Sequence, residues 1–283
     1  MNALFLGRAT LDISYVVESF PIENTKIFSN QFILQPGGPA LNAAITYSLL
    51  GGSGTIISHF GTTTMASMVI AQAIDKFKLS VVDLVDNIDY EFPVSSIIIH
   101  PSCGTRTIIN SPKTKRIYKV KKIIYDAALD MILLDGYNLE GNIEFIKEKK
   151  QQGAIIVLDG GSWKDTLIGV LPYIDIAICS DRFLFPETNK EETIRSLHKL
   201  GVDLVAFTQE ANPIQISTNG QLKSIPVPTI NAVDTLGAGD VLHGAFCYYY
   251  SKYKDFEESI KRAAIIASKS CKYYGTQTWI EHE

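Results

Sequence analysis

Short apolar runs alternate with longer segments of helical periodicity along almost the whole chain. Several of these runs are apolar on successive residues, which is typical of strands that are buried on both faces of a sheet. We expect strands at 3–6, 55–58, 97–99, 131–134, 154–158, 174–179 and 204–207, and helices at 41–50, 65–77, 142–151, 193–200, 240–252 and 256–274. This alternation predicts a three-layer α/β/α fold in which helices cover both faces of a mostly parallel central sheet.

Three segments interrupt this order, because they read as strands that no helix follows. They span 12–17, 25–34 and 92–109. We interpret them as a small antiparallel β flap, or lid, formed by about 12–35 and 90–110 within a single domain of residues 1–283. A flap over a site would exclude water from it. Ordinary edge hairpins are the alternative.

Composition narrows the classes of function. The 283 residues are 46% hydrophobic and 20% charged, as in a globular protein with a sizeable core. The net charge of −4 gives no electrostatic reason to expect nucleic acid or an anionic membrane as a partner. The four cysteines are far apart, which favours reduced thiols over a zinc site. Arg8 and Asp12 interrupt the N-terminal apolar run before it reaches signal-peptide length, so we expect a cytoplasmic protein.

A glycine-rich turn leads into the predicted helix at 240–252. Gly237 and Gly239 flank Ala238, and Asp240 follows them. The free N–H groups of a helix N-terminus and the helix dipole bind anions, phosphate above all. An acid at this place repels a phosphate unless it has a chemical role, such as accepting the proton of an attacking hydroxyl. The alternative is that Asp240 simply caps the helix.

The string from Asp234 to Asp240 reads D-T-L-G-A-G-D and resembles the D-T-x-G-A-G-D signature of the ribokinase-like (PfkB) carbohydrate kinases. The resemblance implies an ATP-dependent kinase in which Asp240 is the base. It also implies that the N–H groups of Gly237, Ala238 and Gly239 form an anion hole, and that Thr235 lies beside the nucleotide. By the same resemblance, Asp234 shapes the loop near a monovalent-cation (K⁺) site, and Mg²⁺ bridges the β- and γ-phosphates.

Two N-terminal segments carry side chains that can form hydrogen bonds with the hydroxyls of a ligand. Asp12 follows the first predicted strand, and a carboxylate there can accept hydrogen bonds from adjacent hydroxyls. Gly37 and Gly38 precede a predicted helix, and the Asn42 amide in its first turn both donates and accepts. These segments resemble the family's sugar-binding pattern, with an Asp after the first strand and then G-G-x-x-x-N. Alone, they also read as a turn followed by a helix with proline at its first position.

Further candidates are single polar residues. Arg106, on a flap strand, can pair with a carboxylate, sulfonate or phosphate of the substrate, although a solvent-exposed arginine is the alternative. Asp135 and Asp159 end predicted strands and either face the same cleft or begin turns.

The nucleotide side departs from the family pattern. Relatives carry T-x-G-x-x-G after a late strand, whereas residues 208–213 read T-Q-E-A-N-P, with Thr208 as the retained position. The family's N-x-x-E motif has no match in 180–187. The small residues around Ala264, together with Gly275, resemble the helix and turn beside the adenine.

Three functions fit these observations. The first is a kinase that phosphorylates a sugar or sugar derivative with ATP. The second is a nucleoside kinase on the same scaffold, which would need aromatic stacking from Phe20, Phe32 or Phe92. The third is a sugar- or nucleotide-binding regulator without turnover, favoured by the lost glycines. An exposed flap also invites pairing into a homodimer.

Overall fold

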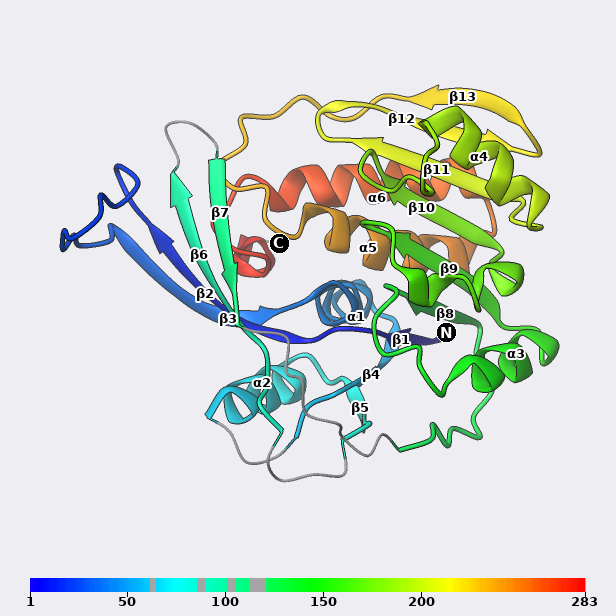
Figure 1. The fold of residues 1–283 in the computed structure, drawn as a ribbon, viewed down its shortest axis with the longest axis horizontal. Coiled ribbons are helices and arrows are strands. Elements are labelled where there is room, and N and C mark those ends of the chain that lie inside the picture. Colours follow the sequence, from blue (N-terminus) through cyan, green and yellow to red (C-terminus); the bar gives the residue numbers. More distant parts are fainter. Residues whose placement is uncertain (62–64, 86–89, 101–104, 112–120, 283) are drawn as a thin grey trace.

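The computed structural model describes residues 1–61, 65–85, 90–100, 105–111 and 121–282. Its main element is a nine-stranded sheet (Figure 1). In chain order the strands are β1 (Asn2–Leu6), β4 (Ser53–Ser58), β5 (Ser80–Asp83), β8 (Met131–Leu134), β9 (Ile155–Gly160), β10 (Ile176–Ser180), β11 (Leu204–Gln209), β12 (Asn212–Thr218) and β13 (Gln221–Ile225). The six runs expected for this sheet are confirmed, whereas β5, β12 and β13 were not expected.

The strand order in this sheet is β13-β12-β11-β10-β9-β8-β1-β4-β5. Every neighbouring pair from β5 to β11 is parallel, and the two pairs at the other edge, β11–β12 and β12–β13, are antiparallel. The chain runs outward from β1 to β5 and then returns to the other side of β1 at β8. The carboxyl ends of β1 and β8 therefore meet at a topological switch point, where α/β sheets bind ligands.

Helices cover both faces of this sheet, so the three-layer expectation is confirmed. On one face lie α1 (Pro39–Leu49), α2 (Met65–Lys76), α5 (Ala238–Tyr253) and α6 (Phe256–Ser270), and on the other lie α3 (Ile143–Gln151) and α4 (Lys190–Lys199). Successive residues of a strand point to opposite faces of the sheet. On β1, Phe5 packs on the side of α1, α2, α5 and α6, and Leu4 and Leu6 pack on the side of α3 and α4. Short 3₁₀ helices are η1 (Asp165–Leu167), η2 (Leu171–Tyr173) and η3 (Thr278–His282).

A second sheet of four strands projects from the body as a lid (Figure 1). It contains β3 (Gln31–Gly37), β2 (Thr10–Val16), β6 (Val94–His100) and β7 (Thr105–Asn110), in that order. The expectation of an antiparallel flap is wrong for one pair, because β2 and β6 are parallel. Both strands leave the main body in the same direction, with Leu11 opposite Val94. The expected strand at 25–34 is wrong in its first half, since β3 begins only at Gln31.

Helices α1 and α5 pack closely and join the N-terminal and C-terminal parts of the chain. The approach requires a glycine on α5, because a Cβ at Gly244 would lie 2.3 Å from the Ala43 carbonyl oxygen. This contact sets Asn42 of α1 beside the first turn of α5. The expected helix at 256–274 ends earlier, at Ser270.

The described part of the chain contains no helix that is both long and apolar enough to cross a membrane. Cys179, Cys247 and Cys271 are buried free thiols, as expected, and Cys103 lies outside the described residues.

Candidate active site

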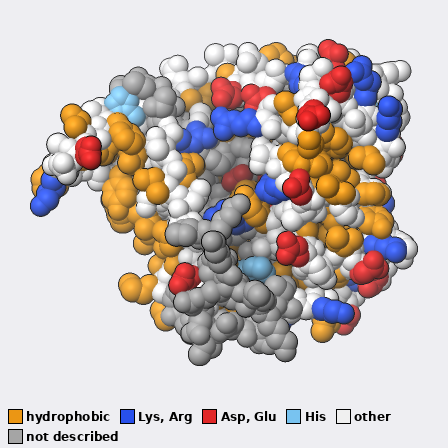
Figure 2. All heavy atoms as spheres, viewed as in Figure 1, with side chains coloured by type: hydrophobic (Ala, Val, Ile, Leu, Met, Phe, Trp, Pro, Cys, Tyr) orange, Lys and Arg blue, Asp and Glu red, His pale blue; other side chains and the backbone are white. Residues whose placement is uncertain are grey.

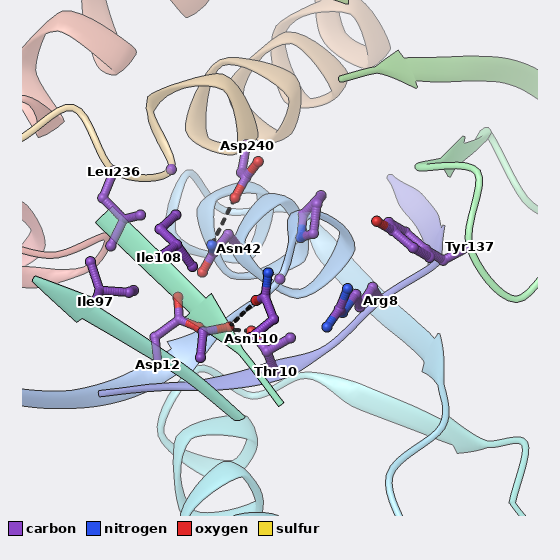
Figure 3. Close-up of a pocket in the computed structure, with 14 residues that line it drawn as sticks. Arg8, Thr10, Asp12, Asn42, Ile97, Ile108, Asn110, Tyr137, Leu236 and Asp240 are labelled. Atoms are coloured by element: carbon purple, nitrogen blue, oxygen red, sulfur yellow. Dashed lines mark hydrogen bonds between the residues drawn. The ribbon is translucent and has the colours of Figure 1, made fainter. Parts of the chain in front are cut away.

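A pocket of about 230 Å³ lies between the lid and the carboxyl ends of β1 and β8 (Figure 3). Figure 2 shows the same face hollowed between the lid and the body. The pocket is lined by Arg8, Thr10, Asp12, Gly38, Pro39, Asn42, Ser95, Ile97, Ile108, Asn110, Tyr137, Leu236, Gly237 and Asp240. Its volume is below the roughly 300–1,000 Å³ of drug-sized sites, which suits a small ligand.

Asp240 projects into the pocket from the first turn of α5 (Figure 3). Its carboxylate Oδ2 accepts a hydrogen bond of 2.8 Å from Asn42 Nδ2. The simple capping alternative is excluded, because the N-cap is Gly237, at φ 67°. Burial, with a further contribution from the Asp159 charge, raises the pKa of Asp240 to about 7, although the Asn42 hydrogen bond lowers it. Asp240 can therefore act as a base near neutral pH.

The loop before α5 is fixed by Asp234. Its Oδ1 accepts a hydrogen bond from the N–H of Leu236, and its Oδ2 accepts one from the N–H of Gly275, both at 2.9 Å. The loop is also packed tightly against the chain end, because a Cβ at Gly237 would lie 2.4 Å from Thr276 Cγ2. The N–H groups at the start of α5 are thereby held in place before any ligand arrives.

Asp12 lies on β2 on the opposite side of the pocket from Asp240 (Figure 3). Burial raises the pKa of its carboxyl, and a hydrogen bond of 2.9 Å from Thr10 lowers it. Gly37 leaves room for this carboxylate, since a Cβ there would lie 2.1 Å from it. Nearby, the Asn42 Oδ1 atom is buried and has no hydrogen-bond partner among the described residues. Both groups can accept hydrogen bonds from ligand hydroxyls.

The lid contributes residues that sequence reasoning missed. Asp12 pairs with Ser95 across β2 and β6, and Ser95 pairs with Asn110 across β6 and β7. Ser95 Oγ donates a hydrogen bond of 3.0 Å to Asn110 Oδ1, so the polar row is continuous to the pocket's outer side. Ile97 and Ile108 supply an apolar surface beside it. Alternation along the predicted flap strands was the signal that could have identified this face.

Arg106, Asp135 and Asp159, which were expected near the substrate, do not line the pocket. Arg106 is exposed, does not line the pocket, and donates a hydrogen bond to Thr235 Oγ1 in the loop before α5. Asp135 is buried and accepts hydrogen bonds from the N–H groups of Arg8, Ala40 and Tyr137 at 2.8, 3.2 and 2.9 Å. It thus joins β1, α1 and β8 beneath the pocket, and burial raises its pKa to about 7.

Asp159 lies beside α5 rather than in the pocket. Its Oδ2 is 3.6 Å from Nδ1 of the buried His243. The two ring nitrogens of His243 lie 2.7 Å from the Gly239 carbonyl oxygen and 3.0 Å from that of Ile178. His243 therefore connects the first turn of α5 to β10, a role that the sequence did not indicate.

Two further pocket residues were also missed. Arg8 follows β1 and Tyr137 follows β8, and the Arg8 Cζ atom lies 5.3 Å from the centre of the Tyr137 ring. Both side chains reach the pocket at the switch point of the sheet (Figure 3). The sequence signal was their position directly after two buried strands.

None of the residues expected at the nucleotide, Thr208, Thr235, Ala264 and Gly275, is among the residues that line the pocket. Thr208 is the last residue but one of β11 and donates a 3.4 Å hydrogen bond to the Cys179 carbonyl. Glu210 has φ 53° in the tight turn between β11 and β12. Ala264 is buried in the core, and Gly275, at φ 81°, contacts Asp234 through its N–H.

Comparison with known proteins agrees with this geometry. A model of the pfkB family carbohydrate kinases matches residues 2–283. Mouse (Mus musculus) ketohexokinase is 25% identical, with 96% of each chain covered. Among solved structures, a microbiome-derived acarbose kinase has a TM-score of 0.80 at 17% identity, covering 98% of this chain and 94% of its own. Arabidopsis thaliana ribokinase complexed with ribose and ATP has a TM-score of 0.76 at 22% identity, covering 99% of this chain and 97% of its own.

Proposed function

Because the chain belongs to the PfkB family of carbohydrate kinases, we propose that it transfers the γ-phosphoryl group of ATP to a hydroxyl of a sugar or sugar derivative in the pocket around Asp240. One observation carries this proposal. A carboxylate with a pKa near 7 lies in the first turn of a glycine-led helix, in the same pocket as the hydroxyl-binding groups Asp12 and Asn42.

The reaction begins with the acceptor hydroxyl at Asp240. Asn42 donates to one carboxylate oxygen and leaves the other for the proton. As the hydroxyl oxygen bonds to the γ-phosphorus, its proton passes to Asp240 and the bond to the ADP oxygen breaks. Asp12 and the unpartnered Asn42 Oδ1 accept hydrogen bonds from other hydroxyls and orient the sugar.

The loop from Gly237 to Gly239 stabilises the charge on the transferred group. Its N–H groups lie at the start of α5, where the helix dipole also favours negative charge. Asp234 contributes indirectly, since it holds this loop through the N–H groups of Leu236 and Gly275. Thr235, Thr208, Ala264 and Gly275 belong to the nucleotide side of the proposal.

Two cations belong to the proposal. Mg²⁺ is bound mainly by substrate phosphates with one or two carboxylates, so it needs no protein cage, and when bound it neutralises the β- and γ-phosphates. One observation bears on a K⁺ site. The Oγ1 atom of Thr276 is buried and has no hydrogen-bond partner among the described residues, so it is free to bind a cation. Thr276 and Asp234, on the two sides of the loop, are the residues that would hold it.

The proposal also includes a homodimer formed through the lid. The lid face turned away from the pocket carries exposed apolar side chains, among them Tyr15, Phe32, Leu34 and Ile109. Hydrophobic side chains gather on the lid in Figure 2. A second copy of the same face is the proposed partner, because a self-complementary apolar face suits a two-fold interface.

The experiment is a coupled ADP-release screen with ATP–Mg²⁺ across ketoses, aldoses, sugar phosphates, sugar acids and nucleosides. Turnover with a sugar or sugar derivative is expected. A preference for nucleosides would favour the nucleoside kinase instead. Absence of turnover, with sugar binding but no ATP binding by calorimetry, would contradict the proposal and favour a binding protein.

A further inference from the structure

Arg8 is the one cation among the described residues that line the pocket. The other charged residues there are the carboxylates of Asp12 and Asp240. Arg8 is half-buried, and its side chain extends into the pocket from the end of β1 (Figure 3). A guanidinium can donate hydrogen bonds to hydroxyls, but its fixed charge and planar fork match a carboxylate or phosphate best.

The Arg8 guanidinium forms no ion pair with a carboxylate of the described residues, and its charge acts only at longer range on Asp12, whose pKa it lowers. The guanidinium contacts the Tyr137 ring, 5.3 Å from Cζ to the ring centre. Lys164 Nζ lies 4.6 Å from the centre of the same ring and donates to the main-chain carbonyls of Asp135 and Ser162. Two positive charges therefore flank Tyr137, and neither forms an ion pair with a described carboxylate. A partly buried charge is normally paired, so a ligand anion is the missing partner.

The buried Asp135 carboxyl does not supply this partner. Asp135 is engaged by the backbone N–H groups of Arg8, Ala40 and Tyr137. These contacts fix the backbone at residue 8 and leave its side chain to the pocket. The Tyr137 ring in turn supports the guanidinium, whose planar fork matches the oxygens of a carboxylate or phosphate.

The position of Arg8 assigns the anion to the acceptor rather than to ATP. The transferred phosphoryl group must lie at Gly237–Asp240, where α5 begins, beside Leu236. Figure 3 shows Arg8 and Tyr137 on the other side of the pocket from Leu236, with Asp240 and Asn42 between them. A molecule with its hydroxyl at Asp240 and its far end at Arg8 is therefore the acceptor.

We infer that the acceptor carries an anionic group, a phosphate ester or a carboxylate, which Arg8 binds while Asp240 receives the proton of its hydroxyl. This inference rests on the proposed function. The anionic group does not react: the new bond joins the acceptor hydroxyl oxygen to the γ-phosphorus, and ADP leaves. Lys164 adds positive charge behind Tyr137, and Asn110 of the lid offers its amide to the same end of the pocket.

The test compares neutral hexoses and pentoses with their phosphate esters and with sugar acids, by ADP release at saturating ATP–Mg²⁺. The proteins are the wild type, Arg8→Gln, Arg8→Lys and the control Arg195→Gln, which removes an exposed arginine on α4. The acceptor with the highest kcat/KM for the wild type is expected to be anionic. Whether it is a phosphate ester or a sugar acid shows which anionic group Arg8 binds. Arg8→Gln is expected to raise the KM for that acceptor by about 10- to 100-fold, with the KM for ATP unchanged. Arg8→Lys keeps part of the affinity, and Arg195→Gln keeps all of it.

Two results would overturn the inference: a neutral best acceptor, or an equal fall of kcat for all acceptors in Arg8→Gln, which would place Arg8 on the transferred phosphoryl group. If the wild type releases no ADP with any acceptor, the proposed function fails instead. Calorimetric titration with D-fructose 6-phosphate and D-gluconate in the absence of ATP then decides the role of Arg8 separately. Binding of either that is lost in Arg8→Gln supports the inference, and no Arg8-dependent binding of either contradicts it.

Discussion

Asp240 combines two opposing requirements at the level of a single residue. It lies where the start of α5 favours negative charge, yet burial and the Asp159 charge disfavour its ionised form. The outcome is a carboxyl with a pKa of about 7 rather than its ordinary value near 4. A base with such a pKa is half ionised near neutral pH and accepts a proton far better than an ordinary aspartate.

The pH dependence of turnover follows from this pKa. The ionised form is the active one, so below pH 7 kcat/KM should fall about tenfold per pH unit, and above pH 7 it should level off. The measurement is kcat/KM between about pH 5.5 and 9, with thermal stability recorded at each pH as a control. A profile that stays flat down to pH 5, with the fold intact, would contradict the role of burial at Asp240.

Part of the site was readable from residues alone. Asp12, Asn42, Gly237 and Asp240 lie in local strings whose chemistry is evident, and the structure brings all four to one pocket. Arg8 and Asn110 were missed, because their relevance depends on which strands end beside each other. The contacts of Asp135 were also hidden, since they are made to backbone groups from three distant segments.

At the scale of elements, the loop before α5 is the part most sensitive to backbone geometry. Gly237 has φ 67° and no space for a Cβ, whereas a Cβ at Gly239, within the helix, would have no atom within 4 Å. The same substitution at two neighbouring sites should therefore have opposite consequences for stability.

Gly237→Ala should lower the free energy of unfolding by about 1–3 kcal/mol, because a positive φ and a clash with Thr276 are both imposed. Gly239→Ala should leave it unchanged or raise it by up to about 1 kcal/mol, as alanine favours helix. Urea unfolding of the two variants beside the wild type measures both effects. Equal losses would show that the loop is not held in the way described.

The elements themselves were largely predictable, for a physical reason. The six inner parallel strands, from β4 to β11 in the sheet, are largely buried and leave apolar runs. The edge strands leave none, because β5 is exposed at Ser80 and Val81 and β13 at Gln221, Leu222 and Lys223. The pairing of strands within the lid was harder to predict from the sequence. The parallel contact between β2 and β6 joins Leu11 to Val94, and no local pattern specifies so distant a partner.

At the scale of the whole molecule, the two ends of the chain meet in one site. The N-terminal part provides Arg8, Asp12 and Asn42, and the C-terminal part provides Leu236, Gly237 and Asp240. The packing of α1 on α5 at Gly244 joins them, and the lid closes the remaining side. The single-domain organisation stays a prediction that this arrangement supports.

The outer face of the lid gives a prediction for assembly. Sedimentation velocity should show a species of twice the 31.3 kDa chain mass, and Phe32→Glu should shift it to the monomer by placing a charge in the apolar face. Ile168→Glu, which changes an equally exposed apolar residue outside the lid, is the control. A wild-type protein that is monomeric at all concentrations would contradict the dimer.

Turnover of Asp240→Asn tests the central claim most directly. The amide keeps an oxygen for Asn42 and removes a buried charge, so the melting temperature should not fall at pH 7 and acceptor binding should persist. The rate of ADP release at saturating substrates should fall by about 10²–10⁴-fold, because the hydroxyl proton loses its acceptor. A folded variant that binds the acceptor and turns over at nearly the wild-type rate would show that Asp240 is not the base.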